Sequence, residues 1–102
     1  MISLNIITFF LTPAPLISVH IIGSVATPTV GQSYTLTCSV SGASVTTYQW
    51  RKDGSAIQDT TEMLSFSLLR ASDAGQYTCR VTVDGVVYSD EQDVVITSKV
   101  IT

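Results

Sequence analysis

Hydrophobic and polar residues alternate with a period of two along much of the chain from residue 18 onward, in short runs separated by turn-forming residues. The clearest run spans residues 32–41, where apolar side chains alternate with Ser and Thr. Its inward positions are Tyr34, Leu36, Cys38 and Val40. Successive side chains of a β-strand point to opposite faces, so this pattern predicts a strand buried on one face. No segment shows the sustained three-and-four spacing of an amphipathic helix.

Similar runs predict further strands over residues 46–52, 62–69, 76–83 and 86–97, with a first strand beginning at Ser18. The expected inward side chains of these runs are Tyr48, Trp50, Leu64, Phe66, Leu69, Tyr77, Cys79, Val81, Val83, Val94 and Ile96. Within the 62–69 run the alternation slips, and Leu69 rather than Leu68 is the expected buried position.

Two Asp-Gly pairs separate consecutive β-rich runs and predict tight hairpin turns, Asp53-Gly54 and Asp84-Gly85. Glycine supplies the positive φ that such turns require, and Asp-Gly between β-branched runs is a strong hairpin signal. A compact corner is expected at residues 71–75. Strands and turns that recur at intervals of roughly 8–12 residues predict an all-β sandwich of two antiparallel sheets.

Composition and charge narrow the function classes. With 102 residues, 45% of them hydrophobic and 13% charged, the chain fits one folded domain rather than a disordered segment. The net charge is −3, and the five basic residues are scattered along the chain. A nucleic-acid binder needs a basic stripe and an anionic membrane attracts a basic cluster, so neither is an expected partner.

Few residues could carry chemistry. His20 is the only histidine, and no nucleophile motif or phosphate-binding glycine loop accompanies it, so we expect no catalytic residue, no cofactor and no metal site. Asp90, Glu91 and Asp93 form a small acidic group, but alternation places Asp90 on the face opposite the other two. We therefore interpret the group as a solvated strand surface rather than a calcium site.

Cys38 and Cys79 are the only cysteines, which is too few for a structural zinc site of four Cys or His ligands. Both lie in the middle of a predicted strand on its inward face, in similar surroundings. Either they form a disulfide, which the matched surroundings favour and which indicates an oxidising compartment, or they are buried free thiols.

Residues 1–17 form an apolar N-terminal segment that precedes the expected domain at 18–98. Its run from Ile6 to Leu11 resembles a signal-peptide core, but no basic residue precedes it and Pro15 follows the small residue Ala14. The alternatives are a cleaved secretion signal and a remnant of upstream sequence. Residues 99–102 are expected to be a tail or the start of a linker.

The chain resembles the immunoglobulin superfamily, specifically its intermediate-set or similarly short domains. The resemblance rests on Cys38, on Trp50 twelve residues later, and on the sequence DAGQYTC at residues 73–79, which fits the family's D-x-G-x-Y-x-C motif. Apolar residues also stand at the family's offsets before this motif, namely Leu64, Phe66 and Leu69. The resemblance implies Greek-key connections, and a disulfide between Cys38 and Cys79 would then tie the two sheets together with Trp50 packed against it.

The resemblance assigns structural roles to the motif residues: Tyr77 as a tyrosine corner, Asp73 as an acceptor for turn amides, and Gly75 as a point of close approach. The sequence departs from the usual family pattern in two places. The interval between Trp50 and Cys79 is too short for the additional strand of antibody variable domains, and no arginine lies at 57–63 to pair with Asp73. Only Arg70 or Lys52 remain as substitutes for that arginine.

The resemblance further implies an extracellular recognition or adhesion module of a cell-surface receptor or a secreted protein. Its partner would be another protein, homophilic or heterophilic, with immunoglobulin-like domains as neighbours and a membrane reached only through other parts of a longer protein. The alternative function is a structural spacer in a tandem array, either extracellular or in a cytoplasmic filament. The expected partner-binding positions are the loop 42–47 and the residues Asp84, Gly85, Tyr88 and Glu91.

Overall fold

Seven β-strands and one 3₁₀ turn make up the computed structural model, which describes residues 16–98. The elements are β1 (Ser18–Gly23), β2 (Tyr34–Ser41), β3 (Gln49–Lys52), β4 (Ser55–Ile57), β5 (Met63–Phe66), η1 (Ala71–Asp73), β6 (Gly75–Val83) and β7 (Val86–Val94). Residues 1–15 of the predicted N-terminal segment 1–17, and all of the predicted tail 99–102, lie outside the described residues.

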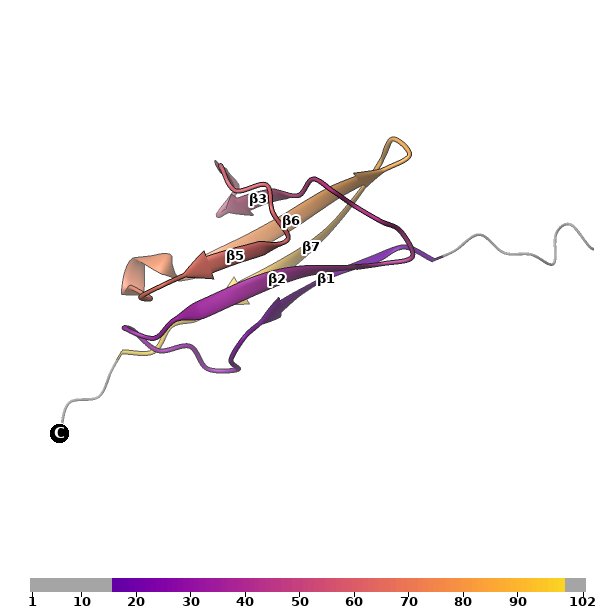
Figure 1. Ribbon diagram of the computed structural model, residues 1–102. Helices are drawn as coiled ribbons and strands as arrows, with labels where there is room; N and C mark the ends of the chain where they lie inside the picture. Colours follow the sequence, from indigo (N-terminus) through magenta and orange to yellow (C-terminus); the bar gives the residue numbers. More distant parts are fainter. Residues whose placement is uncertain (1–15, 99–102) are drawn as a thin grey trace, which may run out of the picture.

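The strands form two sheets packed face to face, with the order β1-β2-β5 in one and β4-β3-β6-β7 in the other (Figure 1). Every named strand pair is antiparallel. The chain passes between sheets from β2 to β3, from β4 to β5 and from β5 to β6, which is a Greek-key arrangement. The predicted all-β sandwich is thus confirmed, and residues 58–62 between β4 and β5 contain no additional strand.

Both Asp-Gly pairs form the two-residue hairpin turns that the sequence predicts. The φ angles are +49° at Asp53 and +84° at Gly54, and +51° at Asp84 and +80° at Gly85. Two consecutive positive values define the turn type whose twist matches that of paired strands. The turns fix the register of β3 against β4 and of β6 against β7.

The core lies between the sheets, around the Cys38–Cys79 disulfide, whose S–S distance is 2.05 Å. Trp50 has no exposed surface, and its indole Nε1 donates a hydrogen bond of 2.9 Å to the carbonyl of Thr61. The other buried core side chains are Val19, Ile21, Tyr34, Leu36, Tyr48, Leu64, Leu69, Tyr77, Val81 and Val94. Phe66 is half-buried and meets the ring of Tyr77 edge-on, with centroids 5.9 Å apart.

Three strands are shorter than their patterns suggest. Residues 46–48 precede β3 without forming strand, and β5 ends at Phe66. Beyond that point Leu68 is 67% exposed while Leu69 is 2% exposed, as the slip in alternation predicts. The backbone of Leu69 is held instead by residues 31–32, with hydrogen bonds of 2.8 and 2.9 Å. β7 likewise ends at Val94, three residues before the predicted end at Thr97.

The turn between η1 and β6 is built from the predicted motif residues. The Tyr77 hydroxyl donates a 2.5 Å hydrogen bond to the carbonyl of Asp73, and an Asp73 carboxylate oxygen accepts one of 2.8 Å from the amide of Arg70. A Cβ at Gly75 would lie 2.8 Å from the Asp53 carboxylate, which itself accepts a bond from the amide of Gln76.

One correction follows at this turn. Asp73 and Gly75 are half-exposed, so they belong to the turn and not to the buried core in which the motif places them. Within residues 16–98 Asp73 has no ion pair, because Lys52 instead approaches Asp53 at 4.0 Å and donates to the carbonyl of Ser72.

We predict that the C38A/C79A variant loses about 2–5 kcal/mol of unfolding free energy, because closing a loop with a sequence separation of 41 restricts the unfolded chain. Denaturant unfolding of the two proteins measures the loss. Alkylation of unreduced, cell-derived protein followed by intact-mass measurement checks the bond itself. Labelling of both cysteines without reduction would contradict it.

A second prediction concerns alkaline stability. Burial, with the nearby carboxylates of Asp73 and Asp53 adding to it, raises the pKa of Tyr77 to about 12 from its ordinary 10.0. The folded state therefore holds this proton more tightly than the unfolded chain, so stability is intact below pH 10 and falls as pH rises toward 12. Tyrosinate absorbance followed during titration should show Tyr77 ionising last.

The Y77F variant should lack that final step and lose about 1–2 kcal/mol of stability, because it also loses the bond to Asp73. Y88F, at a half-buried position without such a bond, serves as the control and should retain the step. An unchanged final step in Y77F would show that another tyrosine holds the raised pKa.

Candidate functional site

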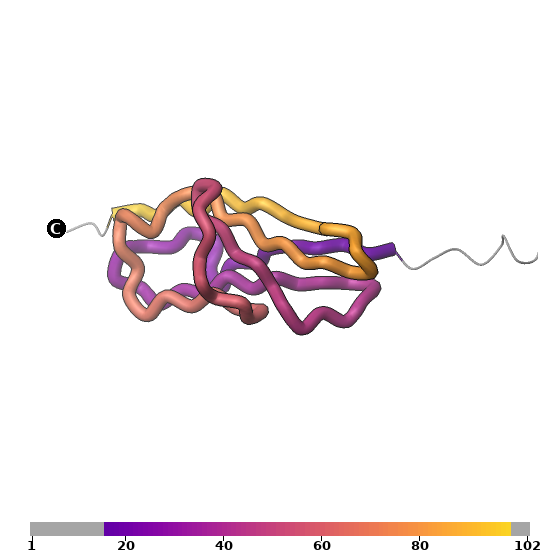
Figure 2. The backbone as a smooth tube through the Cα atoms, turned by 90° about the horizontal axis from the view of Figure 1, so that it is seen from above, coloured from indigo at the N-terminus to yellow at the C-terminus, as the bar shows by residue number. Residues whose placement is uncertain are grey.

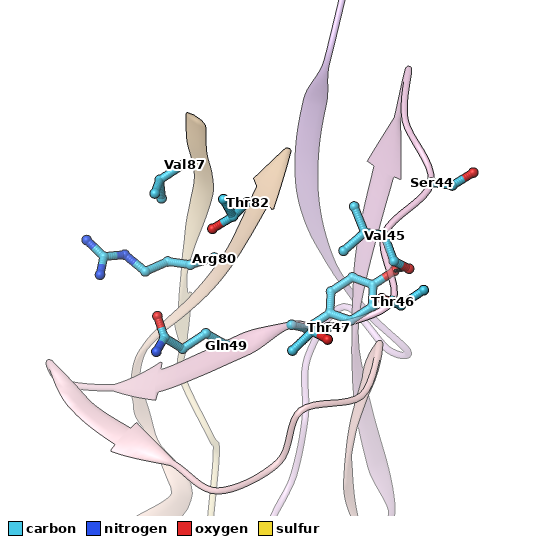
Figure 3. A pocket seen from close by; sticks show the side chains of 9 residues that line it. Ser44, Val45, Thr46, Thr47, Gln49, Arg80, Thr82 and Val87 are labelled. Atoms are coloured by element: carbon cyan, nitrogen blue, oxygen red, sulfur yellow. Dashed lines mark hydrogen bonds between the residues drawn. The ribbon is translucent and has the colours of Figure 1, made fainter. Parts of the chain in front are cut away.

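An open groove of about 450 Å³ lies at one end of the sandwich, between the loop that leads from β2 into β3 and the hairpin formed by β6 and β7. Figure 3 shows loop residues Ser44–Thr47 on one side of it and Arg80, Thr82 and Val87 on the other. Of the segments that the sequence marks as partner-binding candidates, the loop 42–47 lines the groove through residues 44–47. The predicted binding residues Asp84, Gly85, Tyr88 and Glu91 do not line it, although Thr82 and Val87 flank the 84–85 turn.

The loop is held in place by its flanks. Gly42 begins it with a φ of +89°, and a Cβ there would lie 2.2 Å from the Leu16 carbonyl oxygen, so the backbones of residues 16 and 42 are in close approach. At its far end Tyr48 is buried, its amide donates to the carbonyl of Thr60, and its hydroxyl donates to the carbonyl of Val45 at 3.5 Å. The loop is therefore anchored at both ends while residues 44, 46 and 47 stay exposed.

Three side chains from different strands surround the sheet side of the groove. Arg80 of β6 pairs in register with Gln49 of β3. Val87 of β7 lies opposite Thr82, two residues nearer the hairpin turn than Arg80, and is 56% exposed. In Figure 3 the Arg80 guanidinium points away from the sheet, between Gln49 and Val87 in the view. Within residues 16–98 it forms no ion pair. The site thus combines a free positive charge, an amide and an aliphatic surface.

The sequence-predicted binding residues divide into two groups. Asp84 and Gly85 are exposed at the tip of the β6–β7 turn, and Glu91 is exposed on the outer face of β7. The exposed position expected for Tyr88 is wrong. Tyr88 pairs in register with the buried Val81 and packs half-buried against the core, because it lies on the inner face of β7.

Asp90 has a role that the sequence pattern does not reveal. One of its carboxylate oxygens accepts a 2.9 Å hydrogen bond from the amide of Ile21 in β1, across the gap between the two sheets. Ile21 lies opposite Cys38 in the register of β1 with β2. The Cys38 amide donates to the carbonyl of Glu62, on the side of β2 that faces away from β1. The Ile21 amide therefore points away from β2 and out of its own sheet. Asp90 thereby satisfies an edge-strand donor and links the two sheets.

The remaining chemical candidates stay apart. His20 is exposed on β1, Glu91 and Asp93 are exposed on β7, and residues 16–98 contain no group of three side chains able to hold a metal ion. Within the same range, no helix is long and apolar enough to cross a membrane.

The disulfide between opposite sheets, the buried Trp50 beside it and the tyrosine corner together identify the fold. A model of the immunoglobulin domain matches residues 14–97, most of the chain. The chain belongs to the immunoglobulin superfamily. Its described strands, turns and disulfide are therefore those of one immunoglobulin domain.

Known proteins similar to this domain are much longer. Protein sidekick of Drosophila melanogaster is 33% identical over 86 residues, which cover 81% of this chain and 4% of sidekick. A solved structure described as the structural basis for Dscam isoform specificity is 26% identical with a TM-score of 0.69, covering 80% of this chain and 21% of that one. The full ectodomain of mouse nectin-like molecule 4 is 22% identical with a TM-score of 0.71, covering 84% and 32%.

We predict that D90A loses about 1–3 kcal/mol of unfolding free energy, because it leaves the half-buried amide of Ile21 without an acceptor. E91A, next to it on the exposed face, should change stability by less than about 0.5 kcal/mol. Denaturant unfolding compares the two variants, and amide hydrogen exchange at Ile21 should speed up in D90A alone. Equal effects of both substitutions would contradict the assignment.

Proposed function

We propose that this immunoglobulin domain is an extracellular recognition module that binds another protein through the end of the sandwich formed by loop 42–48 and the β6–β7 hairpin. The observation that carries the proposal is the convergence of these two segments on one open groove with an unpaired Arg80 and an exposed Val87. Aliphatic and arginine side chains at a rim of exposed loops suit protein recognition, since arginine is enriched at interfaces and donates in several directions.

The disulfide supports an extracellular setting for the proposed module. The Cys38–Cys79 bond is of a kind that persists in oxidising compartments and is rare in the cytosol. The described chain begins and ends at opposite ends of the sandwich in both views, with the groove at the end where residue 16 lies (Figures 1 and 2).

A spacer role is the second candidate, and that same placement of the ends favours it. Domains joined end to end need their two termini at opposite ends, and the Dscam structures include a chain of four N-terminal immunoglobulin domains. A spacer would use its ends for contact with neighbouring domains and leave the groove without a partner of its own.

To test recognition, a multimer of the domain should be measured for binding to a panel of animal cells, beside the V87K variant. We predict that V87K weakens binding about tenfold or more, because a charge replaces an exposed aliphatic surface that lines the groove. I22K is the matched control. Ile22 is 55% exposed against 56% for Val87, but it lies on the outer face of the other sheet.

The outcomes separate the candidates. Loss of binding in I22K with retention in V87K would move the site to the β1-β2-β5 face and contradict the proposed location. No binding by the unsubstituted multimer to any cell would favour the spacer role. Thermal unfolding of both variants establishes that each remains folded during the comparison.

A further inference from the structure

Two edge strands run beside each other along one side of the sandwich, β1 from one sheet and β7 from the other (Figure 1). The amide of Ser24 donates to the carbonyl of Thr35, which continues the register of β1 with β2, so the even-numbered residues of β1 make its bonds to β2. Backbone groups of successive residues point to opposite sides of a strand. The N–H and C=O of Gly23 therefore point away from β2, to the side on which the Ile21 amide meets Asp90 of β7.

A window of about 340 Å³ opens between these two edges, and we call it the edge window. It lies between the Ile21–Asp90 hydrogen bond at one end and, at the other, Thr97, whose backbone bonds that of residues 28 and 30. Between these points the chain leaves β1 and crosses toward the other sheet. Aliphatic residues line part of the window, namely Val25, Ala26, Pro28, Val94 and Val95.

Tyr34 brings an unpaired hydroxyl to the edge window. The residue is 5% exposed and lines the window beside Gly23, where an added Cβ would collide with the Tyr34 Oη. Within residues 16–98, neither this hydroxyl nor the Gly23 amide has a hydrogen-bond partner. Burial raises the pKa of Tyr34 above its ordinary 10.0, so the hydroxyl keeps its proton and is a donor at neutral pH.

Gln92 adds a side-chain amide from β7. It lies opposite the buried Tyr77 in register and shares the inward phase of β7 with Asp90, so it faces the edge window. Its Nε2 donates to the carbonyl of the adjoining Asp93 at 3.3 Å, while its Oε1 accepts no bond in the described part of the chain. The side chain of Asp93 alternates to the outer face of the sheet. The unpaired groups that converge on the window are therefore uncharged: a backbone N–H, a hydroxyl and a carboxamide oxygen.

A hydroxyl without a partner on a buried side chain costs folding free energy, and such groups are rare in folded proteins. Phenylalanine at position 34 would fill the same volume without this cost. We propose that the edge window binds the side-chain amide of a glutamine or asparagine of a partner protein. The carbonyl oxygen of this amide accepts bonds from Tyr34 and Gly23, and its NH₂ group donates to Gln92. The proposal adds a second contact site to the proposed recognition function and does not involve the groove.

The unpaired groups select this chemistry. The Tyr34 hydroxyl and the Gly23 amide both offer a proton to an acceptor, which lysine and arginine side chains lack. A carboxylate is an acceptor but would meet the like charge of Asp90, which already binds the Ile21 amide. The Oε1 of Gln92 requires a donor, and a neutral carboxamide combines an acceptor with a donor. An extended strand would have to pass the bonds at both ends of the window, whereas a side chain enters from its open side.

Binding of tripeptides with acetyl and N-methylamide ends to the isotope-labelled 102-residue chain, followed by amide chemical shifts, tests the proposal. Ala-Gln-Ala should shift the amides of Gly23, Gln92 and Val95 saturably, with a Kd of roughly millimolar order for so small a ligand. Ala-Glu-Ala replaces the side-chain amide by a carboxylate, and Ala-Met-Ala replaces it by a thioether of similar length. Both should bind about tenfold or more weakly, because neither supplies the acceptor and the donor together.

Substitutions separate a ligand contact from a structural role. Y34F should weaken Ala-Gln-Ala binding about five- to tenfold and leave the unfolding midpoint unchanged or higher, because no bond within the domain is lost. Y77F removes a hydroxyl that is bonded within the domain, so its midpoint should fall. Q92A should also weaken binding, whereas Q58A, at an exposed glutamine between β4 and β5, should leave the Kd unchanged.

Several results would overturn the inference. Equal shifts with Ala-Ala-Ala would show that the window binds peptide backbone, and tighter binding of Ala-Glu-Ala would show an anion site. No saturable shift at the three amides, or a fall in the Y34F midpoint as large as that of Y77F, would show that the window holds solvent and that the hydroxyl serves the fold alone. Cell binding through the groove is measured separately with V87K, so any of these results leaves the proposed recognition function standing.

Discussion

One layer of residues across the middle of the sandwich holds the two sheets together. The Cys38–Cys79 bond joins β2 to β6, Trp50 lies opposite Cys79 in register, and Ile21 lies opposite Cys38. Asp90 also lies opposite Cys79, so its bond to the Ile21 amide closes the same layer at the other edge. A covalent bond worth about 4 kcal/mol on the chain-entropy model and a charge-assisted hydrogen bond thus act at one level. Outside this layer, Trp50 Nε1 donates to the carbonyl of Thr61 and the backbone of residues 28–30 bonds that of Thr97, while the rest of the core is apolar contact.

This central layer leaves the two ends of the sandwich free for different tasks. At one end the η1 turn is closed by hydrogen bonds from Tyr77 and Asp73 and presents few exposed apolar groups apart from Leu68. At the other end, loop residues 44–48 and the β6–β7 hairpin enclose the groove, and the 84–85 turn is exposed at the tip of that hairpin. Loops placed by a rigid scaffold can differ in sequence without cost to the core, which is why binding residues concentrate there. The groove can therefore change its chemistry while the Cys38 layer remains fixed.

Sequence patterns are sufficient for six of the seven strands, the two hairpin turns and the inward face of β2, because alternation and Asp-Gly turns are local signals. The three-residue β4 (Ser55–Ile57) is too short to show an alternation of its own and was not predicted. Sequence patterns are insufficient where a distant backbone group decides the outcome. Asp90 accepts a hydrogen bond from the amide of Ile21, which is 69 residues away in the sequence. No residue near Asp90 indicates this bond. The ends of β3 and β5 depend on hydrogen bonds to residues 60 and 31–32, which local alternation does not encode. The position of Tyr88 was misjudged because the β7 sequence mixes polar and apolar residues on both faces, so its phase is set by pairing with β6.

The outer face of the β1-β2-β5 sheet and that of the β4-β3-β6-β7 sheet differ in charge more than in exposed apolar area. Charge is therefore the property by which a partner would distinguish them. Ile22 and Met63 on the β1-β2-β5 face are about as exposed as Val87, so apolar surface alone does not distinguish one face from the other. Apolar contact tolerates displacement along a flat sheet, because one methyl group replaces another at small cost. Opposite charges do not, since a displacement separates each charge from its partner and loses the attraction between them. The face that holds Arg80 and Glu91 is therefore the one on which charge can hold a partner in a single register.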